Sequence, residues 1–118
     1  MKTSFESLFV WQEARVLVNH IYSMMNYCRD WGFKDQIQRA AVSIMNNIAE
    51  GGDCGSVSKY IYFLNIARGS CSEVRSMTYL CEDLGFCEKA YAETLREKTL
   101  LISSGINSLV KSIKQKQG

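Results

Sequence analysis

The sequence predicts an all-α protein, specifically an antiparallel up-down-up-down four-helix bundle. Apolar residues recur at spacings of three and four along four stretches of the 118-residue chain, which is the period of a helix with one buried face. The chain contains no proline, and its eight glycines fall mostly between these stretches. Long amphipathic helices joined by short loops pack antiparallel, and no alternating strand pattern competes. We expect one four-helix-bundle domain over residues 1–118.

The first predicted helix runs from Thr3 to about Cys28. Thr3, followed three residues later by Glu6, forms a capping-box pattern that satisfies the free N–H groups of a helix start. Residues 29–32, with the sequence Arg-Asp-Trp-Gly, break the helix. Its apolar stripe is formed by Leu8, Trp11, Ala14 or Arg15, Leu17 or Val18, Ile21 and Met25.

The second predicted helix, over residues 34–50, has two distinct faces. One is an apolar stripe that is expected to be buried: Ile37, Ala40, Ala41, Ile44 and Ile48. The other is a stripe of mixed hydrogen-bond donors and acceptors: Arg39, Ser43, Asn46 or Asn47, and Glu50. The glycine pair at 51–52 is predicted to end the helix. A polar stripe beside a packed one indicates contacts beyond the hydrophobic core.

The third predicted helix begins at Ser56 or Ser58 as its N-cap and ends at Gly85. The fourth runs from about residue 87 to residue 113. Gly69 lies in the middle of the third helix, where glycine costs about 1 kcal/mol relative to alanine, so we expect it to admit a close neighbour. Gly105 in the fourth helix raises the same question.

The net charge of +2 is too small to indicate nucleic-acid binding by itself, but its distribution is uneven. Four lysines and no acidic residue follow position 97: Lys98, Lys111, Lys114 and Lys116. One interpretation is a solvated helix end, where lysines suit the negative end of the helix dipole. The other is a basic patch that becomes significant when several copies assemble.

Five cysteines occur without a C-x-x-C pair, and no signal peptide precedes them, which predicts a reducing, cytoplasmic environment. Cys71 and Cys81 fall on an apolar stripe and are expected in the core, whereas Cys54 is the predicted exposed thiol. No apolar run is long enough to span a membrane.

Catalytic and metal-binding patterns are not found. His20 is the only histidine, and no histidine lies three residues after a glutamate, as di-iron bundles require. Neither a phosphate-binding G-x-x-x-x-G-K-[ST] loop nor a G-x-G-x-x-G turn occurs. The glycine-rich residues 51–55 precede a helix N-terminus and are interpreted as a connector; the alternative is an anion site, which Asp53 would oppose. We predict a protein that is not an enzyme and holds no metal or cofactor.

Polar residues on the second and third helices form a candidate network: Arg39, Asn47, Glu50, Arg68 and Glu73. One interpretation is a set of ion pairs and hydrogen bonds between the two helices. The other is that part of the set, together with Ser43, faces another subunit. Tyr62 lies off the apolar stripe and is a candidate interaction surface, because tyrosine is common at interfaces.

Three stretches give the chain a resemblance to a known family. They are Phe5-x-x-Leu8-x-Val10-Trp11-Gln12-x-Ala14, Arg39-Ala40-Ala41-Val42-Ser43-Ile44-x-x-Asn47-Ile48-Ala49-Glu50-Gly51 and Tyr60-x-x-Phe63-Leu64-x-Ile66-Ala67-Arg68-Gly69-Ser70-x-x-Glu73. Together they resemble the bacterial four-helix-bundle proteins encoded in ribosomal-RNA intervening sequences. The accessory protein of diversity-generating retroelements belongs to the same group.

The resemblance implies a homopentameric barrel, and in the retroelement branch a strongly basic barrel binds nucleic acid and a reverse transcriptase. Two features depart from the family. Met45 replaces a frequent proline, which predicts a less bent second helix, and Asp53-Cys54 stands where the family often carries arginine.

We therefore expect a non-enzymatic oligomeric scaffold or adaptor that associates with RNA or DNA through Lys111, Lys114 and Lys116. The alternative is a protein–protein interaction module that binds a client protein and no nucleic acid of its own.

Overall fold

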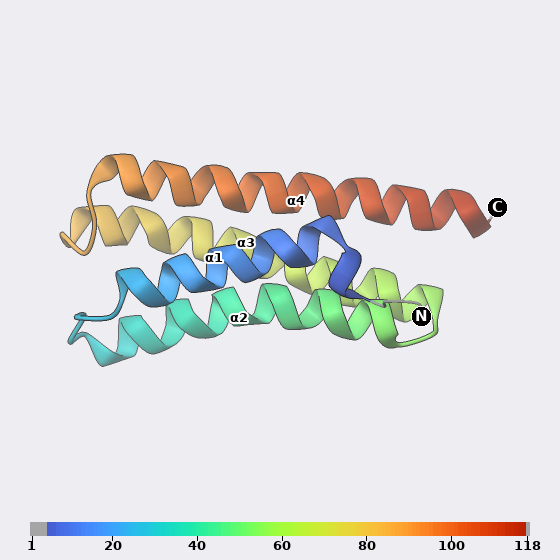
Figure 1. Cartoon of the computed structure of the whole chain (residues 1–118), viewed down its shortest axis with the longest axis horizontal. Coiled ribbons are helices and arrows are strands. Elements are labelled where there is room, and N and C mark those ends of the chain that lie inside the picture. Colours follow the sequence, from blue (N-terminus) through green and yellow to red (C-terminus); the bar gives the residue numbers. More distant parts are fainter. Residues whose placement is uncertain (1–4, 118) are drawn as a thin grey trace.

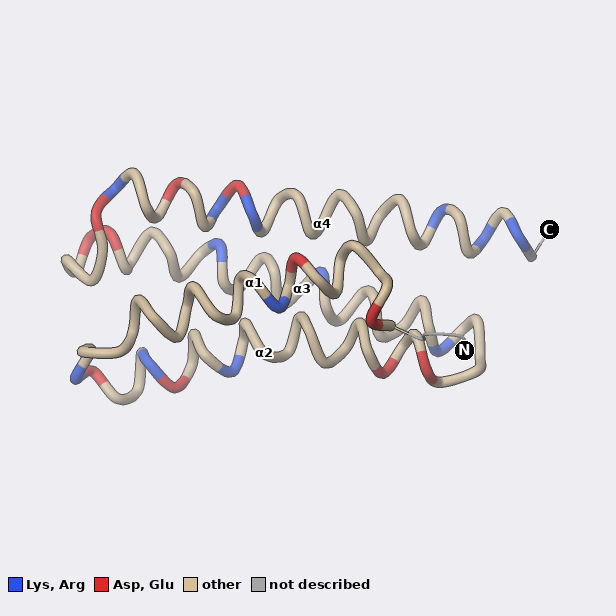
Figure 2. Tube along the Cα trace, in the orientation of Figure 1, with Lys and Arg blue, Asp and Glu red and all other residues tan. Residues whose placement is uncertain are grey.

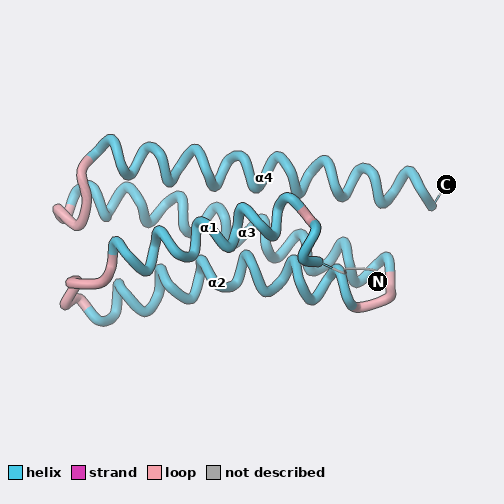
Figure 3. Tube along the Cα trace, viewed as in Figure 1, coloured by secondary structure: helices cyan, strands magenta, loops and turns pink. Residues whose placement is uncertain are grey.

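The computed structural model describes residues 5–117 and contains four α-helices arranged up-down-up-down (Figure 1). A short 3-10 turn, η1, precedes them, and the elements are η1 (Phe5–Ser7), α1 (Phe9–Met24), α2 (Trp31–Asp53), α3 (Val57–Asp83) and α4 (Lys89–Gln117). Within the described range every element is helical and the connections are short (Figure 3). The molecule is a rod of 48 × 23 × 21 Å. The predicted all-α four-helix bundle is confirmed.

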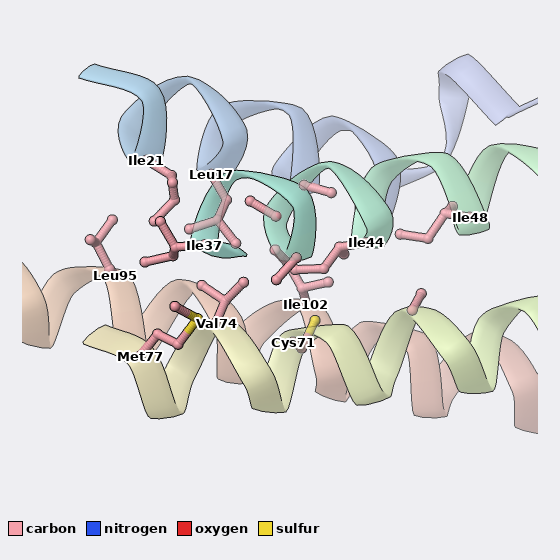
Figure 4. Packing of buried hydrophobic residues seen from close by; sticks show 14 of the residues in the cluster. Leu17, Ile21, Ile37, Ile44, Ile48, Cys71, Val74, Met77, Leu95 and Ile102 are labelled. Carbon is pink, nitrogen blue, oxygen red and sulfur yellow. The ribbon is translucent and has the colours of Figure 1, made fainter. Parts of the chain in front are cut away.

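The core fills the space between all four helices with branched aliphatic side chains and small residues (Figure 4). The predicted apolar stripe of α2 is buried throughout. Cys71 and Cys81 are buried as small core residues, as expected. The largest fully buried side chains include Leu17, Ile21, Met25, Ile37, Ile44, Ile48, Leu64, Val74, Leu95, Ile102 and Ile106.

The start of the chain differs from the prediction. The predicted capping box begins at Thr3, which lies outside the described residues, and Glu6 lies in η1 rather than inside an α-helix. The helix starts only at Phe9, because Leu8 is extended and its N–H is bonded to the carbonyl of Phe5 at 2.9 Å. The Phe5 ring packs on Trp11, with the centroids 5.0 Å apart. α1 also ends at Met24, before the predicted Cys28, and is therefore the shortest of the four helices.

Helix α2 is longer than predicted at both ends. Asp30, placed in the predicted break, is its N-cap and accepts a hydrogen bond from the N–H of Phe33 at 3.1 Å. The helix then runs unbroken past Met45 and through the glycine pair to Asp53, so the predicted end at Gly51 is wrong. Gly55, with φ at +71°, makes the turn instead.

Gly51 serves packing rather than helix termination. A Cβ atom at this position would lie 2.9 Å from Cδ1 of Tyr60 and 3.3 Å from the carbonyl oxygen of the same residue. It would also lie 3.2 Å from Cβ of Phe63. The missing side chain therefore lets the start of α3 fold back closely against the end of α2.

Both ends of α3 match the sequence pattern. Ser56, one of the two predicted caps, accepts a hydrogen bond from the N–H of Lys59 at 3.4 Å. Ser58 lies inside the helix. Gly85, with φ at +77°, follows the end of α3 as predicted.

The two mid-helix glycines have different surroundings. At Gly105 a Cβ atom would lie 2.6 Å from Cγ1 of Val10, so this glycine admits α1. At Gly69 a Cβ atom would meet nothing within 4 Å, so the prediction that Gly69 admits a neighbour is wrong within the described chain. The start of α1 packs beside Gly105. From there α4 continues for several turns and extends beyond the α2–α3 turn (Figure 1).

Candidate functional site

The projecting end of α4 carries the predicted lysines. Lys111, Lys114 and Lys116 are exposed, and the last two lie in the final turn of the helix. Among residues 5–117, none of the three has a carboxylate within 4.0 Å. Figure 2 shows that this half of α4 carries basic residues and no acidic ones, whereas both signs alternate at its other end. The positive charge here is therefore not neutralised within the described chain.

Lys98, the first lysine of the run, has a different environment. Its Nζ donates to Oε1 of Glu13 at 2.8 Å, and both side chains are largely covered. This ion pair joins α4 to α1. Lys98 is thus part of the packing between helices and does not belong to the basic end.

A groove of about 450 Å³ runs between α3 and α4 beside the basic end. Arg68 of α3 crosses to α4 and donates through Nη1 to Oδ1 of Asn107. The lining residues are Arg68, Asn107, Val110, Lys111, Lys114 and Gln115. Arg68, which was predicted to belong to the polar network of the second and third helices, therefore lines the same groove as Lys111 and Lys114.

Lys116 is not among the groove-lining residues. It follows Lys114 by two positions, which is about 200° around the helix. The three lysines predicted as one contact therefore point to different sides of α4. The sequence spacing alone predicts this difference, because Lys111 and Lys114 share a helix face with Asn107, whereas Lys116 lies on another face.

The polar stripe of α2 meets α3 through a small hydrogen-bonded cluster. Oγ of Ser43 lies 2.9 Å from Oγ of Ser70. Nδ2 of Asn47 donates to the carbonyl oxygen of Ser43 at 2.8 Å and to its hydroxyl at 2.9 Å. This half-buried cluster satisfies polar groups inside the α2–α3 contact and gives the two helices a defined register.

The predicted five-residue network is not assembled in this structure. Arg39 pairs along its own helix with Asp35 at 2.9 Å, with both side chains mostly exposed. Glu73 accepts a hydrogen bond from Gln36 of α2 at 3.4 Å. Arg68 contacts α4 instead of α2. That some of these residues contact another subunit stays a prediction.

Glu50 and Tyr62 lie on a different surface, at the α2–α3 turn. Tyr62 is 61% exposed, and its ring meets the Phe63 ring edge-on with the centroids 5.5 Å apart. A hollow of about 630 Å³ opens here and is lined by Ala49, Glu50, Asp53, Cys54, Lys59, Tyr62 and Phe63. Aromatic and aliphatic groups beside two carboxylates and one lysine make this a candidate protein-binding surface.

The thiols and the single histidine have ordinary structural environments. All five cysteines are free. Cys54, the predicted exposed thiol, is instead half-buried, with its Sγ 3.2 Å from the carbonyl oxygen of Gly51. Burial raises the pKa of Cys71 to about 11 and, with neighbouring thiols, that of Cys81 to about 12. His20 is exposed, with Nδ1 3.1 Å from the hydroxyl of Tyr91. Across residues 5–117 no group of three or more His, Cys, Asp or Glu side chains is arranged to hold a metal ion.

A family model for 23S rRNA-intervening sequence proteins matches residues 6–108, which is most of the chain. The chain belongs to this family. The matched range includes the polar stripe of α2 and Arg68 but stops before Lys111. The predicted lysines of this intervening-sequence protein therefore lie outside the matched range.

A solved structure confirms the fold of this intervening-sequence protein. The chain is similar to a crystal structure from Bacteroides thetaiotaomicron, described as a protein with unknown function from the S23 ribosomal protein family. The TM-score is 0.79, with 23% sequence identity over 86% of this chain and 98% of the other. No curated protein matches the chain. In the described part, none of the helices combines the length and the apolar character that crossing a membrane requires.

Proposed function

We propose that this intervening-sequence protein is a non-enzymatic, homo-oligomeric scaffold that associates with RNA through the basic end of α4. The observation that carries the proposal is the set of three exposed lysines without carboxylate partners in the described chain, on a helix end that projects from the bundle. Such a surface attracts phosphates without reading bases.

Assembly multiplies this charge. A homopentamer, as the family resemblance implies, would carry 5 × 2 = +10 and present five copies of the lysine-bearing helix end. Large apolar side chains exposed on α1 and α4 support self-association, because neighbouring copies would cover them. They include Phe9, Val16, Leu100 and Leu101, each at least 40% exposed.

The proposal is tested by measuring mass and RNA retention together. Size-exclusion chromatography with light scattering gives the assembly mass as a multiple of 13.4 kDa, and five copies are expected. The same column, loaded with a structured RNA, is then run with the wild type and with Lys111→Gln/Lys114→Gln/Lys116→Gln. Co-elution of RNA with the wild type, and its loss in an equally assembled triple variant, supports the proposal. A monomer, or RNA retention unchanged by the triple substitution, contradicts it.

A second candidate function is a protein–protein interaction module without a nucleic-acid partner. The hollow around Tyr62 favours it, because an exposed tyrosine beside Phe63 is typical of a protein contact. Assembly that is insensitive to salt, combined with no RNA retention, supports this function over the first. RNA retention lost on Lys→Gln substitution argues against it.

A further inference from the structure

The groove between α3 and α4 presents hydrogen-bond donors from two helices to one space. Asn107, Lys111 and Lys114 follow each other at spacings of four and three, so they lie on one face of α4. Arg68 reaches this face from α3, and its bond to Asn107 fixes where the guanidinium group lies. Cationic groups separated by 43 residues in sequence are thereby brought to one groove of about 450 Å³.

Arg68 differs from the cations that form ion pairs among residues 5–117. Arg39 is paired with Asp35, Arg96 with Glu82 and Lys98 with Glu13. Arg68 is held instead by a neutral amide oxygen, and none of the residues lining the groove is acidic. Asn107 therefore orients the guanidinium without neutralising it, and most of the five N–H donors of arginine stay available to a ligand.

The lining also indicates which part of a nucleic acid fits. It contains no aromatic side chain, so it lacks the aromatic platform on which successive bases usually stack. A planar guanidinium beside two ammonium groups matches the oxygens of a phosphate, which arginine binds through two parallel hydrogen bonds.

We propose that this groove is the phosphate-binding site for the RNA backbone, with Arg68 as its bidentate contact and Lys111 and Lys114 as supporting charges. This inference rests on the proposed function and narrows it to one side of α4. Lys116 lies outside the groove and contributes no direct phosphate contact there.

The test compares substitutions that each remove one positive charge from an exposed side chain. Binding of a fluorescent structured RNA is measured by anisotropy over a salt series for the wild type, R68Q, K111Q, K114Q and K116Q. Each groove variant is expected to weaken binding about 3- to 10-fold and to reduce the salt slope by about 1, whereas K116Q changes affinity less than about 2-fold. Thermal melts check that each variant remains folded.

A second pair of variants tests whether the local environment of the Arg68 guanidinium, and not only the total charge of the helix end, determines binding. Asn107→Asp places a carboxylate beside Arg68 and is expected to weaken binding as much as R68Q. Ser108→Asp adds the same charge one position away, at an exposed residue outside the groove, and is expected to have a smaller effect. Equal effects from the two aspartates would overturn the assigned role of Arg68.

The outcomes separate this inference from the proposed function. If K116Q weakens binding as much as R68Q, the charge acts diffusely and the groove assignment is wrong, while RNA association stands. If the wild type binds no RNA at low salt, both proposals fail. If the wild type binds polyglutamate and not RNA, the groove recognises an acidic polypeptide and the phosphate assignment is overturned.

Discussion

Two glycines inside long helices illustrate how one residue type serves different purposes. Gly51 lies under Tyr60 and Phe63, where a methyl group has no room. Gly69 lies in α3, in open space within the described chain. The same substitution is therefore expected to have opposite effects at the two positions.

Gly51→Ala is expected to destabilise the bundle by about 1–3 kcal/mol, because the added methyl group must displace the start of α3. Gly69→Ala is expected to stabilise it by about 0.5–1 kcal/mol, since alanine lowers the entropy of the unfolded chain and clashes with nothing described here. Urea denaturation of both variants measures these changes. A destabilised Gly69→Ala protein would contradict the open surroundings of Gly69 and would indicate that another copy covers it.

At the scale of single elements, the N-cap at Ser56 determines where α3 begins after the turn at Gly55. Ser56 accepts the N–H of Lys59, while Ser58 contributes only an exposed hydroxyl near that of Ser56. Ser56→Ala is expected to cost about 0.5–1 kcal/mol, the lower part of the usual range because the bond is long at 3.4 Å. Ser58→Ala is the matched control and is expected to change stability by less than about 0.5 kcal/mol. Chemical denaturation of the two variants checks the assignment, and equal losses would contradict it.

The existence of each helix was predictable from apolar periodicity, but some ends were not. The glycine pair at 51–52 has the composition of a helix terminus, and only the packing of Tyr60 on Gly51 explains why the helix continues. At the other end of α2, Asp30 is a residue type typical of an N-cap, but the sequence pattern places it in the break between the first two helices. The early break at Leu8 depends on Phe5 packing against Trp11 and near Gly52, contacts between residues that the local pattern does not connect.

The candidate site was predictable only in part, for a similar reason. Exposed lysines near the end of α4 follow from the sequence alone. The sequence pattern predicts that Arg68 contacts α2, because α2 and α3 are adjacent in sequence and both carry polar residues. Which helix a residue on α3 contacts depends on how α4 packs against α3, and the sequence does not show this packing. The sequence therefore does not indicate that Asn107, Val110 and Gln115 lie beside Arg68.

For the whole molecule, two buried thiols make stability sensitive to alkaline pH. Burial raises the pKa of Cys71 to about 11 and that of Cys81 to about 12, from an ordinary value of 9.0. The folded state thus retains these protons to a higher pH than the unfolded chain. The contribution of these groups to the free energy of unfolding is expected to be constant well below pH 9, to begin to fall near pH 8, and to fall steadily as the pH rises above 9.

Urea denaturation at pH 8, 9 and 10 measures this dependence. The range from pH 8 to pH 10 is dominated by thiols, because the raised pKa values of Tyr60 and Tyr91 act in the same direction mainly near and above pH 10. The Cys87 thiol, whose pKa is also raised by burial, contributes a loss in the same range that the double variant retains. A Cys71→Ala/Cys81→Ala variant is expected to be less stable at every pH but to lose less stability between pH 8 and pH 10. An identical loss in the variant and the wild type would contradict the assignment to these thiols.

The central claim also concerns the whole molecule: an assembly of these bundles contacts RNA through the positively charged end of α4. Its most direct test is the anisotropy of a labelled structured RNA titrated with wild-type protein from low to physiological salt. We expect micromolar or tighter binding at low salt and a steep linear fall of log affinity with log salt, as phosphate contacts displace counterions. Absence of binding at low salt, or an affinity that salt does not change, would contradict the claim and favour the protein-binding surface around Tyr62.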